Sequence, residues 1–273
     1  MKADMHNHTI YSDGSLTPLE LAEYGSSKGL NLIAITDHDS VSAFKEDLTS
    51  SVIPIIKGVE LSTYYNGENI HLLGYFVNNE SPKAIEELLQ YFEQKRKERV
   101  YEIIEKLKKY YDLELVYDDI KKYADGAIGR VHVAKAIEEK YKVPFKEVFD
   151  KYIGNDQLAY VPTENFDFKD AIDVLHNNNA IAVLAHPMYI TKNNVEELIK
   201  LGVDGIEAHY SKHTEEEEQQ YLKLAKKYNL LVTGGSDLHR YPEKEDDVDL
   251  GQATISGKEL EELLEKLNFK IKE

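Results

Sequence analysis

The sequence contains neither cysteine nor tryptophan. Without cysteine no disulfide bond or thiolate metal site can form, so any bound metal must be held by histidine, aspartate or glutamate. Long apolar runs are also missing, and charged Lys2 and Asp4 interrupt the start of the chain. These two absences predict that there is neither a signal peptide nor a membrane-spanning helix. We therefore expect a cytoplasmic protein.

Positive charge is scarce, since 33 lysine and arginine residues stand against 50 aspartate and glutamate residues, for a formal net charge of −17. This balance argues against a broad basic surface for duplex nucleic acid or for an anionic membrane. It leaves room for a small phosphate site at which metal ions supply the positive charge. Hydrophobic residues make up 42% of the chain, enough for a core. The sequence does not determine the oligomeric state, although it is compatible with a monomer.

Short apolar runs alternate with helical patterns along the chain, which is typical of a parallel β/α architecture. The apolar runs follow a first short segment at 5–9 and occupy residues 30–36, 52–62, 69–76, 180–187, 203–210 and 229–237. A long charged helix is predicted from Ser81 to about Tyr110, and shorter helical patterns follow it. We expect a barrel built from residues 1–89 and 161–273, with a helical domain inserted at 90–160.

Two local signals support this organisation. Thr17, Pro18 and Glu20 form the pattern of a capping box with proline at the first helical position, so a helix is predicted to begin there. Asn66 and Gly67 separate two apolar runs and favour the tight turn of a β-hairpin.

Side chains with chemical capacity recur where the predicted strands end. In a strand, His6 and His8 face one side and Asn7 faces the other. The ends of barrel strands converge on one face, where the active site of such folds is built. A lone histidine at a strand end is usually structural, but the whole set predicts a metal site. Its members are His6, His8, His38, Glu60, His71, His186, His209, Asp237 and His239.

The motifs "HNH", "TDHD", "GVE", "AHP" and "GSDLH", in this order, resemble those of the polymerase and histidinol phosphatase (PHP) superfamily of metal-dependent phosphoesterases. The resemblance runs over nearly the whole chain and is strongest to the branch of nucleotide phosphatases and 5′-3′ exoribonucleases. It implies a distorted seven-stranded (β/α)7 TIM-like barrel with a helical insertion. It also implies a phosphoric ester hydrolase.

The resemblance implies two or three divalent ions, of manganese, iron or zinc, because only nitrogen and oxygen ligands are offered. The implied ligand sets are, in turn, His6, His8, Glu60 and Asp237; Glu60, His71 and His186; and Asp13, His38 and His239. Many members of the superfamily have histidine where this chain has Asp13. That departure weakens the third site or favours a harder ion there.

Metal ions suit this chemistry because the negative charge of a phosphate ester repels a nucleophile. The ions clamp phosphate oxygens and lower the pKa of water, so the predicted reaction is attack by a metal-bound hydroxide. Glu60 would bridge two ions at the ~3.5–4 Å typical of two-metal sites. Asp37 and Asp39 flank His38 and could orient imidazoles, or they could be solvated loop carboxylates.

Substrate contacts are expected from two further segments. "GRVHVAKAI" resembles a Gly-Arg-x-His stretch of the family and places Arg130 and His132 in the insertion, where Arg130 offers a planar fork to phosphate oxygens. "HYSKHT" offers His209, Ser211 and His213, and we favour His213 for protonating the leaving group or contacting the phosphate. An ordinary helix-terminal arginine and surface histidines are the alternatives. Asp13, Arg130 and His213 are thus the candidate catalytic residues.

The predicted function is hydrolysis of phosphomonoesters of nucleotides, either 5′-nucleotides or nucleoside 3′,5′-bisphosphates, or of short 5′-phosphorylated oligonucleotides. One alternative is histidinol-phosphate phosphatase, which Asp13 and the Gly-Arg-x-His stretch make less favoured. A non-catalytic, metal-binding PHP module is another, and the full ligand set argues against it.

Overall fold

The computed structural model describes residues 1–124, 128–162 and 166–271. The chain divides into two compact units, of which the first comprises Met1–Glu86 with Phe166–Glu273 and the second comprises Glu87–Asn165. Each unit has a hydrophobic core of its own. The sequence predicts the boundaries after residues 89 and 160, and the proposed role of the insertion as a substrate cap stays a prediction.

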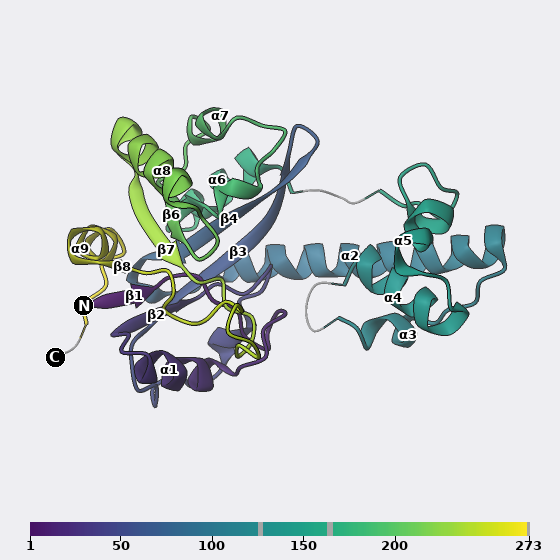
Figure 1. Ribbon diagram of the computed structural model, residues 1–273, viewed down its shortest axis with the longest axis horizontal. Helices are drawn as coiled ribbons and strands as arrows, with labels where there is room; N and C mark the ends of the chain where they lie inside the picture. Colours follow the sequence, from purple (N-terminus) through teal and green to yellow (C-terminus); the bar gives the residue numbers. More distant parts are fainter. Residues whose placement is uncertain (125–127, 163–165, 272–273) are drawn as a thin grey trace. The chain divides into compact units, whose positions relative to one another are not determined.

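The first unit is built around an eight-stranded sheet with the order β7-β6-β5-β4-β3-β2-β1-β8 (Figure 1). The strands are β1 (Lys2–Asp4), β2 (Leu32–Ile35), β3 (Ile55–Tyr65), β4 (Glu68–Phe76), β5 (Ala180–Leu184), β6 (Gly205–Tyr210), β7 (Leu231–Gly235) and β8 (Ile255–Ser256). The sheet curls back on itself, because Met5 N donates to Gly234 O at 3.0 Å and His8 N donates to Leu238 O at 2.9 Å. The expected TIM-like barrel is therefore confirmed, with a two-residue eighth strand added beside β1.

The barrel is distorted because β4 runs antiparallel to both of its neighbours. β3 and β4 form the predicted hairpin, and its turn residues Asn66 and Gly67 adopt φ angles of 44° and 86°. The reversed direction brings the first residues of β4 to the edge at which the parallel strands end. His71 consequently pairs with Ser62, two residues beyond Glu60.

Helices pack against this sheet, and two of them begin at a capping box of the kind predicted at Thr17. At α1, the Thr17 side chain accepts from Glu20 N, and the Glu20 carboxylate accepts from Thr17 N, so the capping box is confirmed. Thr214 and Glu217 form a second capping box at α8. The helices of this unit are α1 (Pro18–Ser27), η1 (Ser42–Lys45), η2 (Val77–Asn79), α6 (Phe168–Asn177), η4 (Pro187–Tyr189), α7 (Val195–Ile199), α8 (Glu215–Tyr228) and α9 (Gly257–Lys266).

The main core of the first unit joins the strands to α9. Ala34, Ile56 and Leu73, from β2, β3 and β4, belong to one buried cluster with Leu260 and Leu263 of α9. Beyond this apolar layer the same strands continue towards the opposite edge of the sheet, which leaves that edge for polar side chains. Burial of the apolar layer is thus what positions the candidate site.

The second unit is helical, as expected from the sequence. Its elements are α2 (Lys83–Tyr111), which begins in the first unit, and then α3 (Tyr117–Lys121), α4 (Arg130–Tyr141), α5 (Phe145–Val148) and η3 (Phe149–Ile153). Its core contains Ile103 and Leu107 of α2 with Val133 and Ile137 of α4. Among the described residues of the chain, no helix combines the length and the apolar character that crossing a membrane requires.

Candidate metal centre

Glu60 lies at the centre of the candidate site, fully buried on β3. Ile56 and Glu60 are four residues apart on the strand, so both face the interior of the barrel. The two oxygens of Glu60 face imidazole nitrogens from five histidines. Oε2 lies 3.0 Å from His6 Nε2, 3.2 Å from His8 Nε2 and 3.2 Å from His38 Nδ1, and Oε1 lies 2.8 Å from His71 Nδ1 and 2.9 Å from His186 Nε2.

The backbone delivers His6 and His8 to this carboxylate although the regular strand β1 ends earlier than predicted, at Asp4. Residues 5–8 stay extended because they pair with the segment after β7, where Asn7 bridges to Leu238. The Asn7 side chain turns the other way and donates to Asp4 Oδ1 at 3.0 Å. The predicted alternation therefore holds.

Glycine at position 235 makes this pairing possible. A Cβ atom added to Gly235 would lie 2.2 Å from the Cβ of His6, far inside contact distance. β7 can therefore approach the histidine segment only without a side chain at that position.

Asp237 and Asp13 extend the cluster beyond Glu60. Asp237 Oδ1 lies 3.0 Å from His8 Nε2, and its Oδ2 accepts a hydrogen bond from the Tyr210 hydroxyl at 2.9 Å. Asp13 Oδ2 lies 3.3 Å from His239 Nε2. The side chain of Asp13 is 46% exposed, whereas that of Asp237 is 14% exposed, so Asp13 stands at the open side of the cluster.

Two candidate ligands have unusual backbone conformations. His186 has a φ of 22° and Asp237 has a φ of 57°, both in the positive range that residues with side chains rarely adopt. The His186 N–H is held by a hydrogen bond of 2.8 Å to Glu207 Oε2, and the Asp237 N–H is held by one of 2.8 Å to His6 O. Strain maintained by surrounding contacts is characteristic of functional sites.

Within the described residues there are three groups of possible metal ligands. In each group, every residue offers one donor atom that lies within 4.8 Å of the donor atoms of the other members. The groups are His6, His8, Glu60 and Asp237; His8, Asp13, His38 and His239; and His38, Glu60 and His71. The first group coincides with the first implied ligand set. The third group differs from the second implied ligand set, because it contains His38 in place of His186. His186 nevertheless contacts the same oxygen of Glu60 as His71 does. The assignment of ligands to individual ions stays a prediction.

Metal ions fit this cluster because several of its buried atoms have no hydrogen-bond partner in the described part of the chain. These atoms are Nδ1 and Nε2 of His8, Nδ1 of His38 and Oδ1 of Asp237. His8 Nε2 and Asp237 Oδ1 are close to each other but not aligned for a hydrogen bond. A buried polar atom without a partner is costly, and a shared cation satisfies such atoms together.

The proximity of opposite charges shifts the pKa values in the cluster. Burial alone would lower the pKa of His8, but the negative charges of Asp237 and Glu60 beside it raise the pKa to about 10. Burial alone would raise the pKa of Glu60, but the neighbouring imidazoles, with His38 first, hold it well below its ordinary value. At His38 burial dominates and lowers the pKa to about 4. The carboxylates are thus ionised and suited to bind cations.

Sequence reasoning missed Glu207 and Tyr210 of β6. Glu207 is fully buried, accepts a hydrogen bond from His6 Nδ1 at 3.0 Å and holds the His186 N–H. With Nδ1–H donating to Glu207, His6 directs Nε2 towards Glu60. A carboxylate within an otherwise apolar strand was the available signal for this residue.

The carboxylates beside His38 accept hydrogen bonds from neighbouring loops, and their predicted role in orienting imidazoles stays a prediction. Asp37 accepts hydrogen bonds from Thr9 N at 2.6 Å, from Thr9 Oγ1 at 2.7 Å and from Ser12 Oγ at 2.6 Å, and thereby fixes the loop after His8. Asp39 Oδ1 accepts from Ser62 N at 2.9 Å, beside the end of β3.

The residues of β6 and the following loop that we expected to contact the substrate lie outside the cluster, each among different neighbours. His209 stands between Glu218 of α8 and Glu259 of α9, at 3.3 Å and 3.2 Å. Ser211 Oγ donates to Ser236 O at 3.0 Å. His213 Nδ1 donates to Ala208 O at 2.8 Å, and burial lowers the pKa of this imidazole, which favours its neutral form. The three predicted substrate roles are not supported by a contact with the cluster and stay predictions.

Arg130 and His132 belong to the second unit. Arg130 donates from Nη1 to Asn155 Oδ1 at 2.9 Å and lies over the Tyr160 ring, 5.1 Å from its centroid. His132 Nδ1 accepts a hydrogen bond from Gly129 N at 3.0 Å at the start of α4. Their predicted roles in phosphate binding stay predictions.

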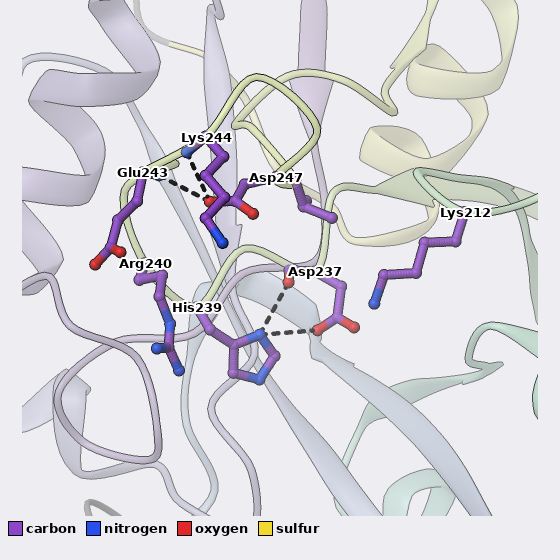
Figure 2. Close-up of a pocket in the computed structure, with 8 residues that line it drawn as sticks. Lys212, Asp237, His239, Arg240, Glu243, Lys244 and Asp247 are labelled. Atoms are coloured by element: carbon purple, nitrogen blue, oxygen red, sulfur yellow. Dashed lines mark hydrogen bonds and ion pairs between the residues drawn. The ribbon is translucent and has the colours of Figure 1, made fainter.

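A cavity of about 380 Å³ opens beside the cluster, and Asp237 and His239 belong to both. Figure 2 shows Lys212 reaching towards Asp237 from one side and Arg240 standing on the other side of His239. Lys244, Glu243, Asp247 and Val248 complete the lining. The sequence analysis did not identify these cations, because isolated surface lysines and arginines carry no signal.

Comparison with known proteins supports a common origin with phosphoesterases. The sequence profile of the PHP domain family matches residues 4–232. A 5′-3′ exoribonuclease of Haemophilus influenzae is 34% identical over 248 residues, covering 87% of this chain and 90% of the relative. A 3′,5′-nucleoside bisphosphate phosphatase of Chromobacterium violaceum is 27% identical, covering 86% of each chain.

Solved structures show the same fold. A protein of Bifidobacterium adolescentis described as a metal-dependent phosphoesterase superposes with a TM-score of 0.75 at 25% identity, covering 97% of this chain and 96% of the other. A Chromobacterium violaceum protein described as an amidohydrolase, with bound sulfate, gives the same TM-score and identity and covers 97% of each chain.

Proposed function

The chain belongs to the PHP domain family, and from this premise we propose that it is a metal-dependent hydrolase of phosphate esters. Its substrates are phosphomonoesters of nucleotides or short 5′-phosphorylated oligonucleotides. The names of two relatives, an exoribonuclease and a nucleoside bisphosphate phosphatase, support this class of substrate.

The observation that carries the proposal is the single buried carboxylate of Glu60 facing five imidazole rings at 2.8–3.2 Å. A carboxylate accepts about four hydrogen bonds, and each neutral imidazole has one donor and one acceptor nitrogen, so protons alone do not satisfy the arrangement. Divalent cations do, because each can take an oxygen of Glu60 together with nitrogens of the surrounding histidines.

The residues of the site would have three distinct roles: holding the metal ions, positioning the metal ligands and leaving access for the substrate. Glu60, Asp237 and the histidines would hold two or three ions, whose native identity is manganese, iron or zinc. When bound, such ions neutralise phosphate charge and lower the pKa of water. Glu207 holds His6 and His186 in place, and Tyr210 holds the second oxygen of Asp237. The side chain of Asp13 is half-exposed, so the substrate would reach the metal ions from the side of the cluster where Asp13 stands.

Substitution of the ligands tests the proposal. In manganese-loaded protein, Asp237→Asn and His8→Ala should each lower kcat/KM for a phosphomonoester by more than about a hundredfold, because each removes a metal ligand. His176→Gln is the matched control, since His176 pairs with Asp204 away from the cluster and its loss should change the rate by less than about twofold. Circular dichroism checks that the variants are folded. Full activity in both ligand variants would contradict the proposal.

A substrate panel then separates the proposed class from the alternative enzyme. Hydrolysis rates are compared for AMP, adenosine 3′,5′-bisphosphate, 5′-phosphorylated RNA and histidinol phosphate. The proposal expects the nucleotide group to be preferred. Preference for histidinol phosphate would assign the chain to the other activity, while bound metal without hydrolysis of any of them would indicate a non-catalytic module.

A further inference from the structure

Asp4 is a carboxylate at the end of β1 to which the proposed reaction gives no role. Its side chain is fully buried, and it lies two residues before the candidate ligand His6. Among the described residues, the hydrogen bonds that reach Asp4 come from neutral N–H and O–H groups. A buried carboxylate is costly unless donors satisfy it, so the conformation of Asp4 and the placement of these donors depend on each other.

One oxygen of Asp4 holds the two chain segments that carry three candidate ligands. Oδ1 accepts hydrogen bonds from Ser236 N and from Asn7 Nδ2, each at 3.0 Å. Asn7 stands between two of the ligands, and Ser236 directly precedes the third. These ligands belong to one group of possible metal ligands together with Glu60, and they are His6, His8 and Asp237.

The other oxygen of Asp4 holds Ser236 a second time and reaches the loop after β7. Oδ2 accepts from Ser236 Oγ at 2.5 Å and from Gly251 N at 2.9 Å. Ser236 Oγ in turn accepts from Gln252 N at 3.2 Å. One carboxylate therefore binds both the N–H and the hydroxyl of the residue that leads into Asp237.

This double contact matters because the backbone of Asp237 has a φ of 57°. A conformation of this kind persists only where the surrounding contacts maintain it. The Asp237 N–H is held by His6 O at 2.8 Å, and the residue before it is held by Asp4. Loss of the contact with Asp4 would let the Asp237 carboxylate move from its position 3.0 Å from His8 Nε2.

We propose that Asp4 is a positioning residue of the metal centre, which acts through Ser236 and Asn7 to hold the ligands beside them in the geometry that binds a divalent ion. The inference rests on the proposed function and adds to it a residue that does not itself bind the ion. Groups that orient metal ligands typically change metal affinity by about 10- to 100-fold. The effect of Asp4 should therefore appear in metal affinity as well as in stability.

The test is the affinity of the full-length protein for manganese(II) alone, measured by competition with a fluorescent chelator where circular dichroism shows each variant to be folded. Asparagine keeps the size of Asp4, but only its oxygen accepts hydrogen bonds, so one pair of donors is left facing an NH₂ group. Asp4→Asn should lower manganese affinity by about 10- to 100-fold. Its hydrolysis of AMP should fall at limiting manganese and recover at excess manganese, which a purely structural defect would not show.

Ser236→Ala is a milder variant that tests the same contact if Asp4→Asn does not fold. It removes the hydroxyl and keeps the N–H, so manganese affinity should fall by about fivefold, as expected for one hydrogen bond. The matched control is Asp249→Asn in the same loop. Asp249 accepts from the Tyr24 hydroxyl at 2.6 Å and pairs with Lys28, so its loss should loosen the loop from α1 and change manganese affinity by less than about twofold.

Unchanged manganese affinity in folded Asp4→Asn, or in Ser236→Ala where the first variant does not fold, would overturn the inference and leave the proposed function intact. An equal loss of affinity in Asp249→Asn would also overturn it, because anchoring of the loop would then explain the effect. Absence of hydrolysis by the unaltered, manganese-loaded protein would instead contradict the proposed function, while the measured affinities would still decide the role of Asp4.

Discussion

At the scale of single residues, the site depends on how the buried groups orient one another. His6 uses both ring nitrogens, with Nδ1 facing Glu207 Oε1 and Nε2 facing Glu60 Oε2, each at 3.0 Å. Fixing one nitrogen by a carboxylate selects the tautomer and aims the other nitrogen at the metal position. Glu207 also holds the strained backbone of His186. One residue thus positions two candidate ligands, which face different oxygens of Glu60.

Replacement of Glu207 by glutamine tests this positioning role. Glutamine keeps the size of the side chain, but only its oxygen can accept a hydrogen bond. That oxygen can take the place of the carboxylate oxygen that faces the His186 N–H or of the one that faces His6 Nδ1, so one of the two hydrogen bonds is lost. We expect manganese affinity to fall by about 10- to 100-fold, measured by competition with a fluorescent chelator. Glu216→Gln, an exposed position on α8, serves as the control. Unchanged affinity in the Glu207 variant would show that it has no positioning role.

Residue chemistry decided which parts of the site the sequence could predict. The nine candidate ligands stand out because histidine and carboxylate at strand ends are unusual in an apolar context. His209 was singled out for the same reason, since it also ends a strand. A register shift between Glu207 and His209 places it between two helix glutamates, and its role in substrate binding stays a prediction. Lys212 and Arg240 could not be identified as site residues from the sequence, because a role for either depends on the side chains that surround it in the folded protein.

At the scale of elements, the hairpin of β3 and β4 both builds the site and is tied to the rest of the barrel. Glu68, at the start of β4, accepts hydrogen bonds from the backbone N–H groups of Thr191, Lys192 and Asn193. Burial opposes ionisation, but these donors dominate and lower the pKa of Glu68 to about 2. The contact fixes the loop after η4, close in sequence to His186.

The shifted pKa of Glu68 predicts a pH dependence of stability. Its ordinary value is 4.5, so the ionised carboxylate stabilises the fold above pH 4.5, and this contribution is lost as the pH falls towards 2. Glu68→Gln should therefore lower the free energy of unfolding at pH 7, and the difference from the unaltered protein should shrink between pH 4.5 and pH 3. Urea unfolding at each pH measures it.

Glu23→Gln, at an exposed position of α1, is the control for the loss of a carboxylate. A difference between Glu68→Gln and the unaltered protein that stays constant with pH would contradict the role assigned to Glu68.

Element types were predictable from the sequence, but some of their ends were not. The capping box at Thr17 and the Asn66-Gly67 turn are local signals, so α1 and the hairpin were predicted correctly. β1 was predicted to include His6 and His8 but ends at Asp4. The extended backbone beyond it is held by pairing with residues after β7, a long-range contact that no local pattern reveals.

At the scale of the whole molecule, a chain with a surplus of negative charge gathers carboxylates and imidazoles from residue 6 to residue 239 into one cluster around the buried Glu60. The alternation of strands and helices predicted the barrel, because each parallel strand delivers its last residues to the same edge. The eighth strand was not predicted, since two residues carry no periodicity.

The central claim is that this cluster holds divalent ions that are needed for phosphoester hydrolysis. Its most direct test is a crystal structure of the manganese-loaded protein with anomalous diffraction at the manganese edge, together with the activity of the same preparation. We predict two or three anomalous peaks within bonding distance, ~2.0–2.2 Å, of oxygens and nitrogens that include Glu60 Oε1 or Oε2, and loss of hydrolysis when a chelator removes them. Full hydrolysis by protein without a metal peak beside Glu60 would contradict the account.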